Sequence, residues 1–417
     1  MADKKPQIRF KGFTDDWEQR KFASVFDGLQ NNTLSRAELN YESGTVKNVH
    51  YGDVLIKFGD YIDASETELP YISDAAKADK FKNSFLQDGD IIFADTAEDD
   101  TVGKCTEIQG SEGLKLLSGL HTIACRPKEK YGPMFLGYYI NSPAYHNQLK
   151  PLMQGIKVTS ISKSALQDTN MTMPKSVDEQ TMIGEYFSNL DNLITLHQRK
   201  YDKLKNIKKS MLEKMFPREG SHFPEIRFAG FTDPWEQRKL SEVVGVYDGV
   251  HQTPHYTDSG VMFLSVENIA TLTSQKFISE EAFERDYRVY PQKGDVLMTR
   301  IGDVGTPNVV ETSEKLAFYV SLALLKPIEI DSYFLCNAIQ SPRFKKGLKD
   351  RTLVTAIPQK INKDEIGKVD ILMPESASEQ AQIGTYFHQL DTLITLHQRK
   401  LEKLQAIKRS MLEKMFV

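Results

Sequence analysis

Cysteine is scarce in this sequence, because Cys105, Cys125 and Cys336 are the only three among 417 residues. Three distant cysteines make neither a disulfide framework nor the Cys-x-x-Cys spacing of a zinc site, and they are typical of a reducing compartment. Long apolar runs are also missing, since no stretch approaches the roughly 18 residues of a membrane helix. The opening "MADKKPQIRF" lacks the apolar segment of a signal peptide. We therefore expect a cytoplasmic protein without a membrane partner.

Motifs of common enzyme chemistry are absent as well. The sequence contains no phosphate-binding Gly-x-x-x-x-Gly-Lys-Ser/Thr, no His-Glu-x-x-His, no Gly-x-Ser-x-Gly and no Asn/Asp-Pro-Pro-aromatic loop of adenine methyltransferases. The acidic run "DTAEDD" (95–100) offers oxygen ligands of the kind that Mg²⁺ binds, and it keeps a single-chain metal-dependent nuclease open as an alternative function. A solvated turn is the favoured interpretation of this run. We expect no catalytic residue, metal site or cofactor in this chain.

Two internal repeats dominate what is present. Residues 178–216 match 378–416 at 27 of 39 positions by direct count, and both copies contain the octapeptide "LITLHQRK". A shorter repeat, "PQIRFKGFTDDWEQRK" (6–21) and "PEIRFAGFTDPWEQRK" (224–239), matches at 13 of 16 positions. The chain thus reads short repeat, variable block, long repeat, twice. A length of 417 residues is also enough for two or three domains.

The variable blocks, 22–177 and 240–377, resemble each other only in fragments, such as "QDGDIIFADT" and "QKGDVLMTRI". Ser-Pro pairs in both blocks predict helix starts with serine as the N-cap and proline in the first turn. Apolar stretches bounded by Gly, Asp or Pro predict strands. The expected strands are "GDIIFAD" (89–95), "HTIACRP" (121–127), "GVMFLSVENI" (260–269) and "GDVLMTRI" (294–301). Each block therefore predicts a compact α+β domain.

The long repeat predicts a helix, since its apolar residues recur at steps of three and four and neither copy contains proline. A helix of this length is about 55 Å long and must bury its apolar stripe, and its own copy is the obvious partner. His197 and His397 lie on the stripe, where a hydrogen-bonded seam residue is favoured over a metal ligand. The expected helix-interface residues are Phe187, Leu190, Ile194, His197 and Leu204, with Phe387, Leu390, Ile394, His397 and Leu404.

Positive charge is local rather than global, because the formal net charge is −4. The span 343–363 carries seven Lys or Arg residues against one acid, and the span 143–163 carries three lysines and no acid. Basic strips with interleaved hydroxyls and amides suit phosphate and base contacts, although a solvated helix face explains the charge equally well. The candidate DNA contacts are Lys157, Thr159, Ser160, Lys163, Arg343, Lys346, Arg351, Thr355, Gln359 and Lys360.

Three single residues allow two interpretations each. Arg300 follows an expected strand, where it could hold guanine bidentately or form an ion pair with a nearby acid. Trp17 and Trp235, the only tryptophans, both lie in the short repeat. We favour a packing role for them over base stacking.

This layout resembles the DNA specificity (S) subunit of type I restriction-modification systems. The resemblance rests on "IRFKGFTDDWEQRK" and "IRFAGFTDPWEQRK", on "GDVLMTRIGDVGTPNVV" (294–310), and on the Pro-x(4)-Glu-Gln entries at 174–180 and 374–380 into the repeated helices. It covers essentially the whole chain. It implies two duplicated mixed α/β target recognition domains separated by two long antiparallel coiled-coil helices, in a pseudo-twofold arrangement. The implied domains are 1–177, the spacer helix 178–216, 217–377 and the spacer helix 378–417.

The resemblance also implies the partners. Each recognition domain would read one half of an asymmetric bipartite sequence in double-stranded DNA. The helices would dock two methyltransferase (M) subunits, and restriction (R) subunits would join them. S-adenosylmethionine, ATP and Mg²⁺ would belong to those partners and not to this chain. Besides the nuclease, a coiled-coil adaptor that does not contact DNA stays open as a further alternative.

Overall fold

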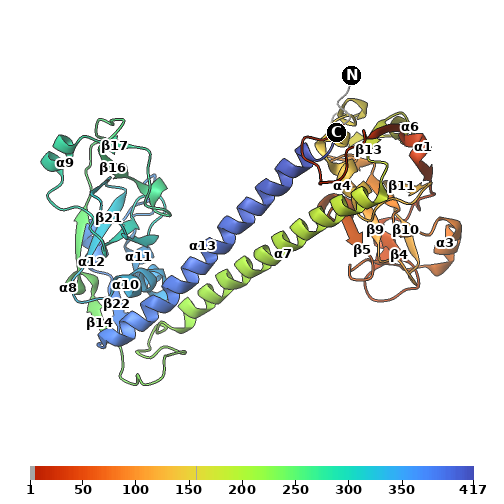
Figure 1. The fold of residues 1–417 in the computed structure, drawn as a ribbon. Coiled ribbons are helices and arrows are strands. Elements are labelled where there is room, and N and C mark those ends of the chain that lie inside the picture. The colour runs from red at the N-terminus through yellow and green to blue at the C-terminus, as the bar shows by residue number, and fades with distance from the viewer. Residues whose placement is uncertain (1–4, 156) are drawn as a thin grey trace. The chain divides into compact units, whose positions relative to one another are not determined.

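The computed structural model describes residues 5–155 and 157–417. The chain forms two compact units (Figure 1). Unit 1 contains the chain up to His197 together with Lys400–Val417, and unit 2 is Gln198–Arg399. Unit 1 is therefore completed by a segment from the far end of the chain, whereas unit 2 is one continuous stretch that begins and ends in a long helix.

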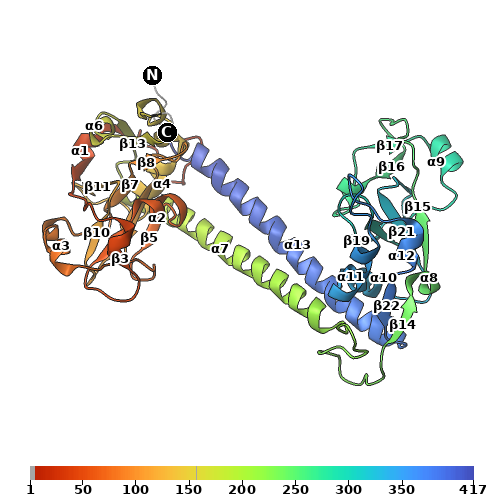
Figure 2. The same cartoon turned by 180° about the vertical axis from the view of Figure 1, so that it is seen from behind.

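The two long repeats are the helices α7 (Val177–Lys214) and α13 (Ala377–Lys414), each of 38 residues. In unit 1 the side chain of Phe187 stacks on Phe416, and in unit 2 Phe387 packs near Phe216. An early residue of one helix thus meets a residue just beyond the end of the other, so the two helices are antiparallel within each unit (Figures 1 and 2). The predicted helix pairing is confirmed.

Unit 1 is built on a five-stranded sheet with the order β2-β11-β7-β9-β5. A second sheet has the order β10-β4-β6-β3, and β1 pairs with β13 and β12 with β8. The strands are β1 (Glu18–Lys21), β2 (Phe26–Gly28), β3 (Leu39–Asn40), β4 (Lys47–Val49), β5 (Tyr61–Asp63), β6 (Tyr71–Ile72), β7 (Ile91–Ala94), β8 (Thr96–Ala97), β9 (Cys105–Gln109), β10 (Leu116–Ser118), β11 (Thr122–Pro127), β12 (Thr159–Ser160) and β13 (Asn170–Met173).

Unit 2 repeats the plan with fewer strands. Its main sheet has the order β15-β21-β18-β19, a smaller sheet has the order β17-β16-β20, and β14 pairs with β22. The strands are β14 (Glu236–Lys239), β15 (Val244–Asp248), β16 (Val261–Leu264), β17 (Phe277–Ile278), β18 (Val296–Thr299), β19 (Pro307–Val309), β20 (Leu316–Phe318), β21 (Leu322–Pro327) and β22 (Asp370–Met373).

Short helices connect and cover these strands. In unit 1 they are α1 (Phe22–Val25), α2 (Tyr51–Ile56), α3 (Ala75–Asp79), α4 (Phe135–Asn141), α5 (Pro143–His146) and α6 (Lys163–Gln167), with 3₁₀ turns at Arg36–Glu38, Lys82–Ser84 and Lys150–Leu152. In unit 2 they are α8 (Leu240–Val243), α9 (Glu280–Asp286), α10 (Ser332–Gln340), α11 (Pro342–Arg351) and α12 (Lys363–Gly367), with a 3₁₀ turn at Val266–Asn268.

The local predictions hold at several points. All four predicted strands are present as β7, β11, β16 and β18, and the strands β7 and β18 are buried along their whole length. Ser142 and Ser341 are N-caps with proline in the first turn, and the Ser341 side chain accepts a hydrogen bond from the Phe344 N–H. Two mixed α/β domains and two antiparallel helices confirm the predicted fold class.

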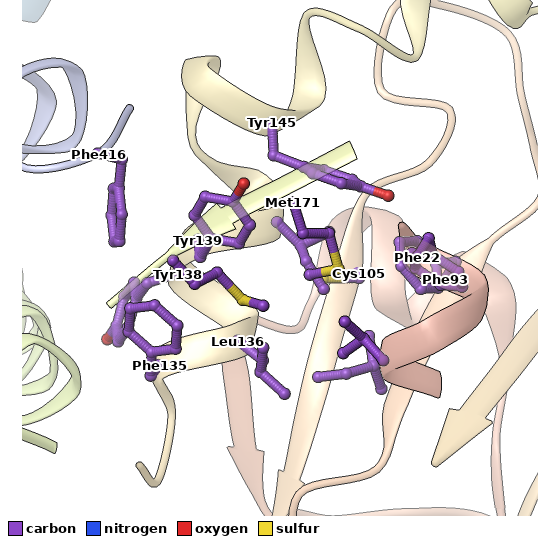
Figure 3. Close-up of a cluster of buried hydrophobic side chains, with 14 of the residues drawn as sticks. Phe22, Phe93, Cys105, Phe135, Leu136, Tyr138, Tyr139, Tyr145, Met171 and Phe416 are labelled. Carbon is purple, nitrogen blue, oxygen red and sulfur yellow. The ribbon is translucent and has the colours of Figure 1, made fainter. Parts of the chain in front are cut away.

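The main core of unit 1 is rich in aromatic residues and lies between its main sheet, α4 and the helix pair. Figure 3 shows Phe416, from the end of the chain, beside Phe135, Tyr138 and Tyr139 of α4. Unit 2 has a corresponding core that includes Phe216. Each core thus uses residues that follow the last turn of a long helix.

A glycine near the start of each long helix allows close packing against the preceding domain. A Cβ on Gly184 would lie 2.2 Å from the Pro133 carbonyl oxygen, and a Cβ on Gly384 would lie 2.6 Å from a carboxylate oxygen of Asp331. Glycine weakens a helix interior by about 1 kcal/mol relative to alanine. The close contact with the start of α4 or α10 explains why glycine stands here. Within 5–155 and 157–417, no helix is long and apolar enough to cross a membrane.

Candidate nucleic-acid interface and helix anchors

A short hairpin projects from unit 2 at residues 353–360, here called hairpin 2. The Leu353 N–H donates to the Lys360 carbonyl at 2.8 Å, and the reverse bond measures 3.4 Å. The hairpin tip is apolar and exposed, with Val354 at 64% and Ile357 at 101% exposure. Large exposed apolar side chains at the end of a basic segment suit a surface that meets another molecule.

Hairpin 2 packs on the loop that follows β18, so two stretches that the sequence singled out separately lie together. The Gly302 N–H donates to the Gln359 carbonyl at 2.8 Å, and the Gln359 Nε2 donates to the Gly302 carbonyl at 2.9 Å. The Ile361 N–H donates to the Arg300 carbonyl at 3.0 Å, and the Ile361 side chain is buried. These bonds fix the base of the hairpin and leave its tip exposed.

Unit 1 carries a hairpin at the corresponding place, formed by the described residues 154–155 and 157–160 and here called hairpin 1. Gln154 and Ser160 exchange backbone hydrogen bonds of 2.9 and 2.8 Å. The Ile161 N–H donates to the Asp95 carbonyl at 2.9 Å, as Ile361 does to Arg300. Among its described residues Val158 has an exposed apolar side chain, at 51% exposure. The two hairpins share a framework and differ in the residues that they present.

Arg300 lies beneath hairpin 2 and is only 5% exposed. Its guanidinium forms an ion pair with Asp248 and donates through Nε to the Ile361 carbonyl at 3.1 Å. Burial lowers the pKa of Arg300 from its ordinary value. Of the two interpretations of Arg300, the structure contains the ion pair with an acid, here Asp248, and the side chain supports the loop. The guanine contact stays a prediction.

Three other candidate cations have partners inside unit 2. The Arg343 guanidinium donates to the Gln237 side chain at 2.8 Å, Lys346 forms a salt bridge with Glu219 at 2.7 Å, and Arg351 pairs with Glu365 at 3.2 Å. The two ion pairs, Lys346 with Glu219 and Arg351 with Glu365, are partly or largely exposed, where such contacts contribute little and exchange readily. The structure does not bring these three side chains onto the hairpin itself.

The remaining DNA-contact candidates lie on or beside the two hairpins. Thr159 is half-buried, and its hydroxyl donates to the Ala97 carbonyl at 3.3 Å. Exposed positions are Lys157, Ser160 and Lys163 in unit 1 and Thr355, Gln359 and Lys360 in unit 2. Each unit therefore presents hydroxyl groups and a lysine beside an exposed apolar side chain.

The acidic run at 95–100 contains β8, which pairs with β12 of hairpin 1, and continues into the bend that follows. Asp99 accepts hydrogen bonds from the backbone and hydroxyl of Thr101, and these bonds lower the pKa of the Asp99 carboxyl. Over the described parts of the chain, no group of three or more His, Cys, Asp or Glu side chains is placed to hold a metal ion. The nuclease alternative gains no support from this loop.

The short repeat fastens the start of each long helix. In unit 1 the Arg9 guanidinium holds Glu179 through two bonds of 2.6 and 2.9 Å, and the Trp17 indole donates to the same carboxylate at 3.4 Å. In unit 2 Arg227 holds Glu379 at 2.7 and 2.8 Å. Trp17 and Trp235 are each 1% exposed, which confirms their packing role.

The glutamine of each Glu-Gln pair makes a second connection. The Gln180 side chain accepts from the Gly132 N–H at 2.8 Å and donates to the Pro174 carbonyl at 2.8 Å. The Gln380 side chain accepts from the Asp331 N–H and donates to the Pro374 carbonyl, both at 2.9 Å. These residues join the helix start to its own domain, a role that sequence reasoning missed although both pairs stand in the repeated motif.

The predicted helix-interface residues divide into two groups by burial. Phe187, Leu190, Phe387 and Leu390 are buried in the unit cores. The others are half-buried, namely Ile194, His197, Leu204, Ile394, His397 and Leu404. Exposed leucines flank them in both copies of "LITLHQRK", namely Leu193, Leu196, Leu393 and Leu396, at 43–45% exposure.

A half-buried lysine crosses between the helices in each unit. In unit 1 the Lys408 ammonium lies 2.8 Å from Asp60 and 2.7 Å from Asp191. Burial disfavours its charge, but the two carboxylates outweigh this effect and raise the pKa of Lys408. In unit 2 the corresponding Lys208 binds Asp391 at 2.6 Å. The lysines of the helix tails at these two positions are therefore structural.

Comparisons with known proteins add an independent line of evidence. The family described as type I restriction modification DNA specificity domain matches residues 14–206 and 232–406, which is more than half of the chain. The type I restriction enzyme MjaVIII specificity subunit of Methanocaldococcus jannaschii is 23% identical over 279 residues, which are 63% of this chain and 65% of that protein. The chain thus spans just under two thirds of the length of this relative.

A second relative from the same organism is matched over nearly its whole length. The putative type I restriction enzyme MjaX specificity subunit is 22% identical over 423 residues, covering 95% of this chain and 92% of that protein. The crystal structure of a type I restriction-modification system S subunit from M. genitalium has a TM-score of 0.65 and 14% identity, and covers 99% of both chains. This structural likeness shows a shared fold.

Proposed function

The chain belongs to the family of type I restriction-modification DNA specificity proteins, and from that premise we propose that its two units read the two halves of one bipartite, asymmetric DNA sequence. The observation that carries this proposal is the pair formed by hairpin 1 and hairpin 2. They share a backbone framework and are anchored at corresponding positions, yet they present different side chains. Two hairpins with a similar backbone and different side chains suit two half-sites that differ in sequence.

The exposed chemistry of hairpin 2 fits the edges of base pairs. Apolar side chains such as Ile357 contact the thymine methyl group, the Gln359 amide pairs with adenine, and Lys360 reaches a phosphate or guanine. Hairpin 1 offers Lys157 and Ser160 beside Val158 in the same way. Phosphate contacts fix the position of the protein, and contacts with base edges give the sequence preference.

The long helices are proposed to dock the partner subunits. The octapeptide "LITLHQRK" keeps two half-exposed leucines in each copy, and such surfaces are typical of protein interfaces. Because the copies are identical, two molecules of one partner can bind equivalent surfaces. We propose that these partners are two methyltransferase subunits, which are joined by restriction subunits.

The chemistry is proposed to reside in those partners. The methyltransferase subunits would bind S-adenosylmethionine and modify adenine, and the restriction subunits would use ATP and Mg²⁺. In this proposal the present chain supplies no catalytic residue and selects the DNA sequence.

Binding to DNA over a salt series tests the role of the hairpins. Lys157→Ala and Lys360→Ala are each expected to weaken binding and to reduce the slope of log K against log salt concentration by about 0.9, because each removes one phosphate contact. Lys293→Ala is the matched control, since this exposed lysine precedes β18 at the end opposite the hairpin. Unchanged affinity and slope in both hairpin variants would refute the proposed contact surface.

A further inference from the structure

The two units differ at one place beside their helix pair, and the difference can be followed residue by residue. Helices α4 and α10 correspond, since each ends at a Ser-Pro pair, Ser142-Pro143 or Ser341-Pro342. Tyr138 and Asn337 each stand four residues before that serine. A large aromatic side chain in unit 1 is therefore replaced by a small amide in unit 2.

In unit 1 tyrosines fill the space between α4 and α7. The Tyr138 ring is fully buried and packs against Phe187 at a centroid distance of 5.2 Å, and its hydroxyl donates to Asp191 at 2.7 Å. Tyr61, from the edge strand β5, lies beside it at 6.1 Å and bonds the Ser188 hydroxyl at 2.8 Å. The Asp191 carboxylate is thus satisfied by both a tyrosine and Lys408.

In unit 2 the corresponding space is a cavity. The main sheet ends at β19, whereas in unit 1 the strand β9 is followed by β5, which carries Tyr61. A pocket of about 390 Å³ lies between β19, α10 and α13 of unit 2, a volume within the range of small-ligand sites. Its lining includes Asn308, Tyr333, Asn337, His388, Asp391 and Arg399.

Asn337, one of the residues that line the pocket, has a buried acceptor that lacks a donor. Asn337 is 2% exposed, and its Nδ2 donates to the Tyr333 carbonyl at 2.7 Å. Its Oδ1 is buried and, among the described residues, has no hydrogen-bond partner. A buried polar atom without a partner costs about 1–3 kcal/mol. Asp391, the counterpart of Asp191, is bound by Lys208, and asparagine has replaced the tyrosine that would complete its contacts.

We propose that the unit 2 pocket binds a phenol-type group, meaning a planar aromatic ring that carries a hydrogen-bond-donating hydroxyl. The hydroxyl donates to Asn337 Oδ1 or to Asp391, as Tyr138 does to Asp191. The ring lies beside Tyr333 and His388, whose own rings are 4.4 Å apart, in a setting that favours aromatic contacts. The site goes beyond DNA reading, and either a free phenolic molecule or a tyrosine side chain of a bound protein can supply this chemistry.

Ligand-observed saturation-transfer NMR on the full chain tests the site with p-cresol as the probe. We expect saturable binding with a dissociation constant on the order of 1 mM, typical of a ligand of this size. Toluene has the same ring and no hydroxyl, and it should bind at least about tenfold more weakly if a hydrogen bond is made. Equal signals from both probes would show an ordinary apolar cavity and overturn the proposal.

Two variants locate the binding site. Asn337→Tyr places a ring in the pocket and should abolish the p-cresol signal. Thr395→Trp blocks the exposed lip on α13 without changing the core, so it gives the same test if the first variant folds poorly. Lys293→Ala should bind p-cresol as the parent does. Unaltered binding in the lip variant, or no binding in the parent chain, would contradict the assignment.

A competition experiment distinguishes the two possible sources of the phenol group, a free molecule and a tyrosine of a bound protein. Adding the methyltransferase subunit, a step that rests on the proposed function, should displace p-cresol if a partner tyrosine enters the pocket. Persistence of the p-cresol signal in the assembled complex would exclude a tyrosine of that subunit and leave a free phenolic molecule as the ligand to be sought. Because p-cresol binding to the isolated chain needs no DNA and no partner, a failure of the DNA proposal leaves this test intact.

Discussion

Single residues explain why α7 and α13 begin with the same Glu-Gln pair. Glu179 and Glu379 are each 1% exposed, and each is held by an arginine and a tryptophan of the short repeat. A buried charge of this kind is tolerated only when its partners are complete. The short and long repeats therefore depend on each other, although many residues separate them in sequence.

This dependence predicts the effect of removing one carboxylate. Glu379→Ala removes the buried carboxylate and leaves the half-buried Arg227 guanidinium without its partner, and it is expected to reduce the free energy of unfolding by about 3–5 kcal/mol. Glu375→Ala, an exposed position just before α13, should change it by less than about 0.5 kcal/mol. Chemical denaturation measures both. Equal effects of the two substitutions would show that the anchor contributes no stability.

Glu107 makes the stability of unit 1 depend on pH. Burial raises the pKa of its carboxyl from 4.5 to about 7, although hydrogen bonds from the Gly137 and Met134 N–H groups oppose this shift. Between these pH values the folded state keeps a proton that the unfolded state has released. The stabilising contribution is therefore complete below about pH 4.5 and is lost as the pH rises through 7.

The corresponding experiment compares two substitutions across this pH range. In the parent chain the group should reduce the free energy of unfolding by about 3 kcal/mol between pH 4.5 and 7. Glu107→Gln should flatten this part of the pH profile, and Glu129→Gln, an exposed position, should leave it unchanged. A parent profile and a Glu107→Gln profile that run parallel would rule out titration of Glu107.

Among the helices and strands, those that produce a local pattern of apolar residues could be predicted from the sequence. Buried strands such as β7 and the two long helices follow from apolar runs and from steps of three and four. Hairpins 1 and 2 were recognised only as basic strips, because their anchoring bonds come from loops about 60 residues away. The interpretation of Arg300 as a guanine contact was open for the same reason, since its partner Asp248 lies on another strand.

The role of the helix ends was also invisible in the sequence. Phe216 and Phe416 look like ordinary last members of an apolar stripe, yet each is buried in a core together with a tryptophan from a short repeat. Such a contact depends on the antiparallel pairing and not on any local pattern. The unit 2 pocket was equally hidden, because it arises from a missing strand and one smaller side chain.

The helix ends lead to a prediction about stability. Phe416→Ala and Phe216→Ala each remove an aromatic ring from a core, and each is expected to reduce the free energy of unfolding by about 3–5 kcal/mol. Phe223→Ala is the matched control, because Phe223 is 53% exposed and should cost little. Thermal or chemical unfolding provides the measurement. A cost below about 1 kcal/mol for both core variants would mean that the helix ends are dispensable.

For the whole molecule, the repeats have a common physical reason. Both long helices contribute residues to both units, and the same contacts recur in each, such as Lys408 with Asp191 and Lys208 with Asp391. A substitution in one long helix alone would remove a contact that its residue makes with the other long helix. It would also make the two proposed partner-binding surfaces differ. The hairpins are free of this constraint, so their sequences differ.

If the two units read two half-sites, as proposed above, helix length predicts the spacing of those half-sites. Inserting one heptad into both α7 and α13 adds about 10 Å to each helix, which corresponds to about three base pairs of DNA. We expect the unspecified gap in the recognised sequence to widen by that amount, with both half-sites unchanged. Inserting the heptad into one helix only is the control and should disrupt the pairing. An unchanged gap in the double insertion would refute the idea that the helices measure it.

The claim that each hairpin reads its own half-site is tested most directly by the methylated DNA motif. The measurement is genome sequencing of adenine methylation in cells that express the partner subunits with either the parent chain or a chain whose residues 353–360 are replaced. The account predicts that one half of the motif changes or is lost while the other half and the gap are kept. A motif that is unchanged, or altered in both halves, would contradict it.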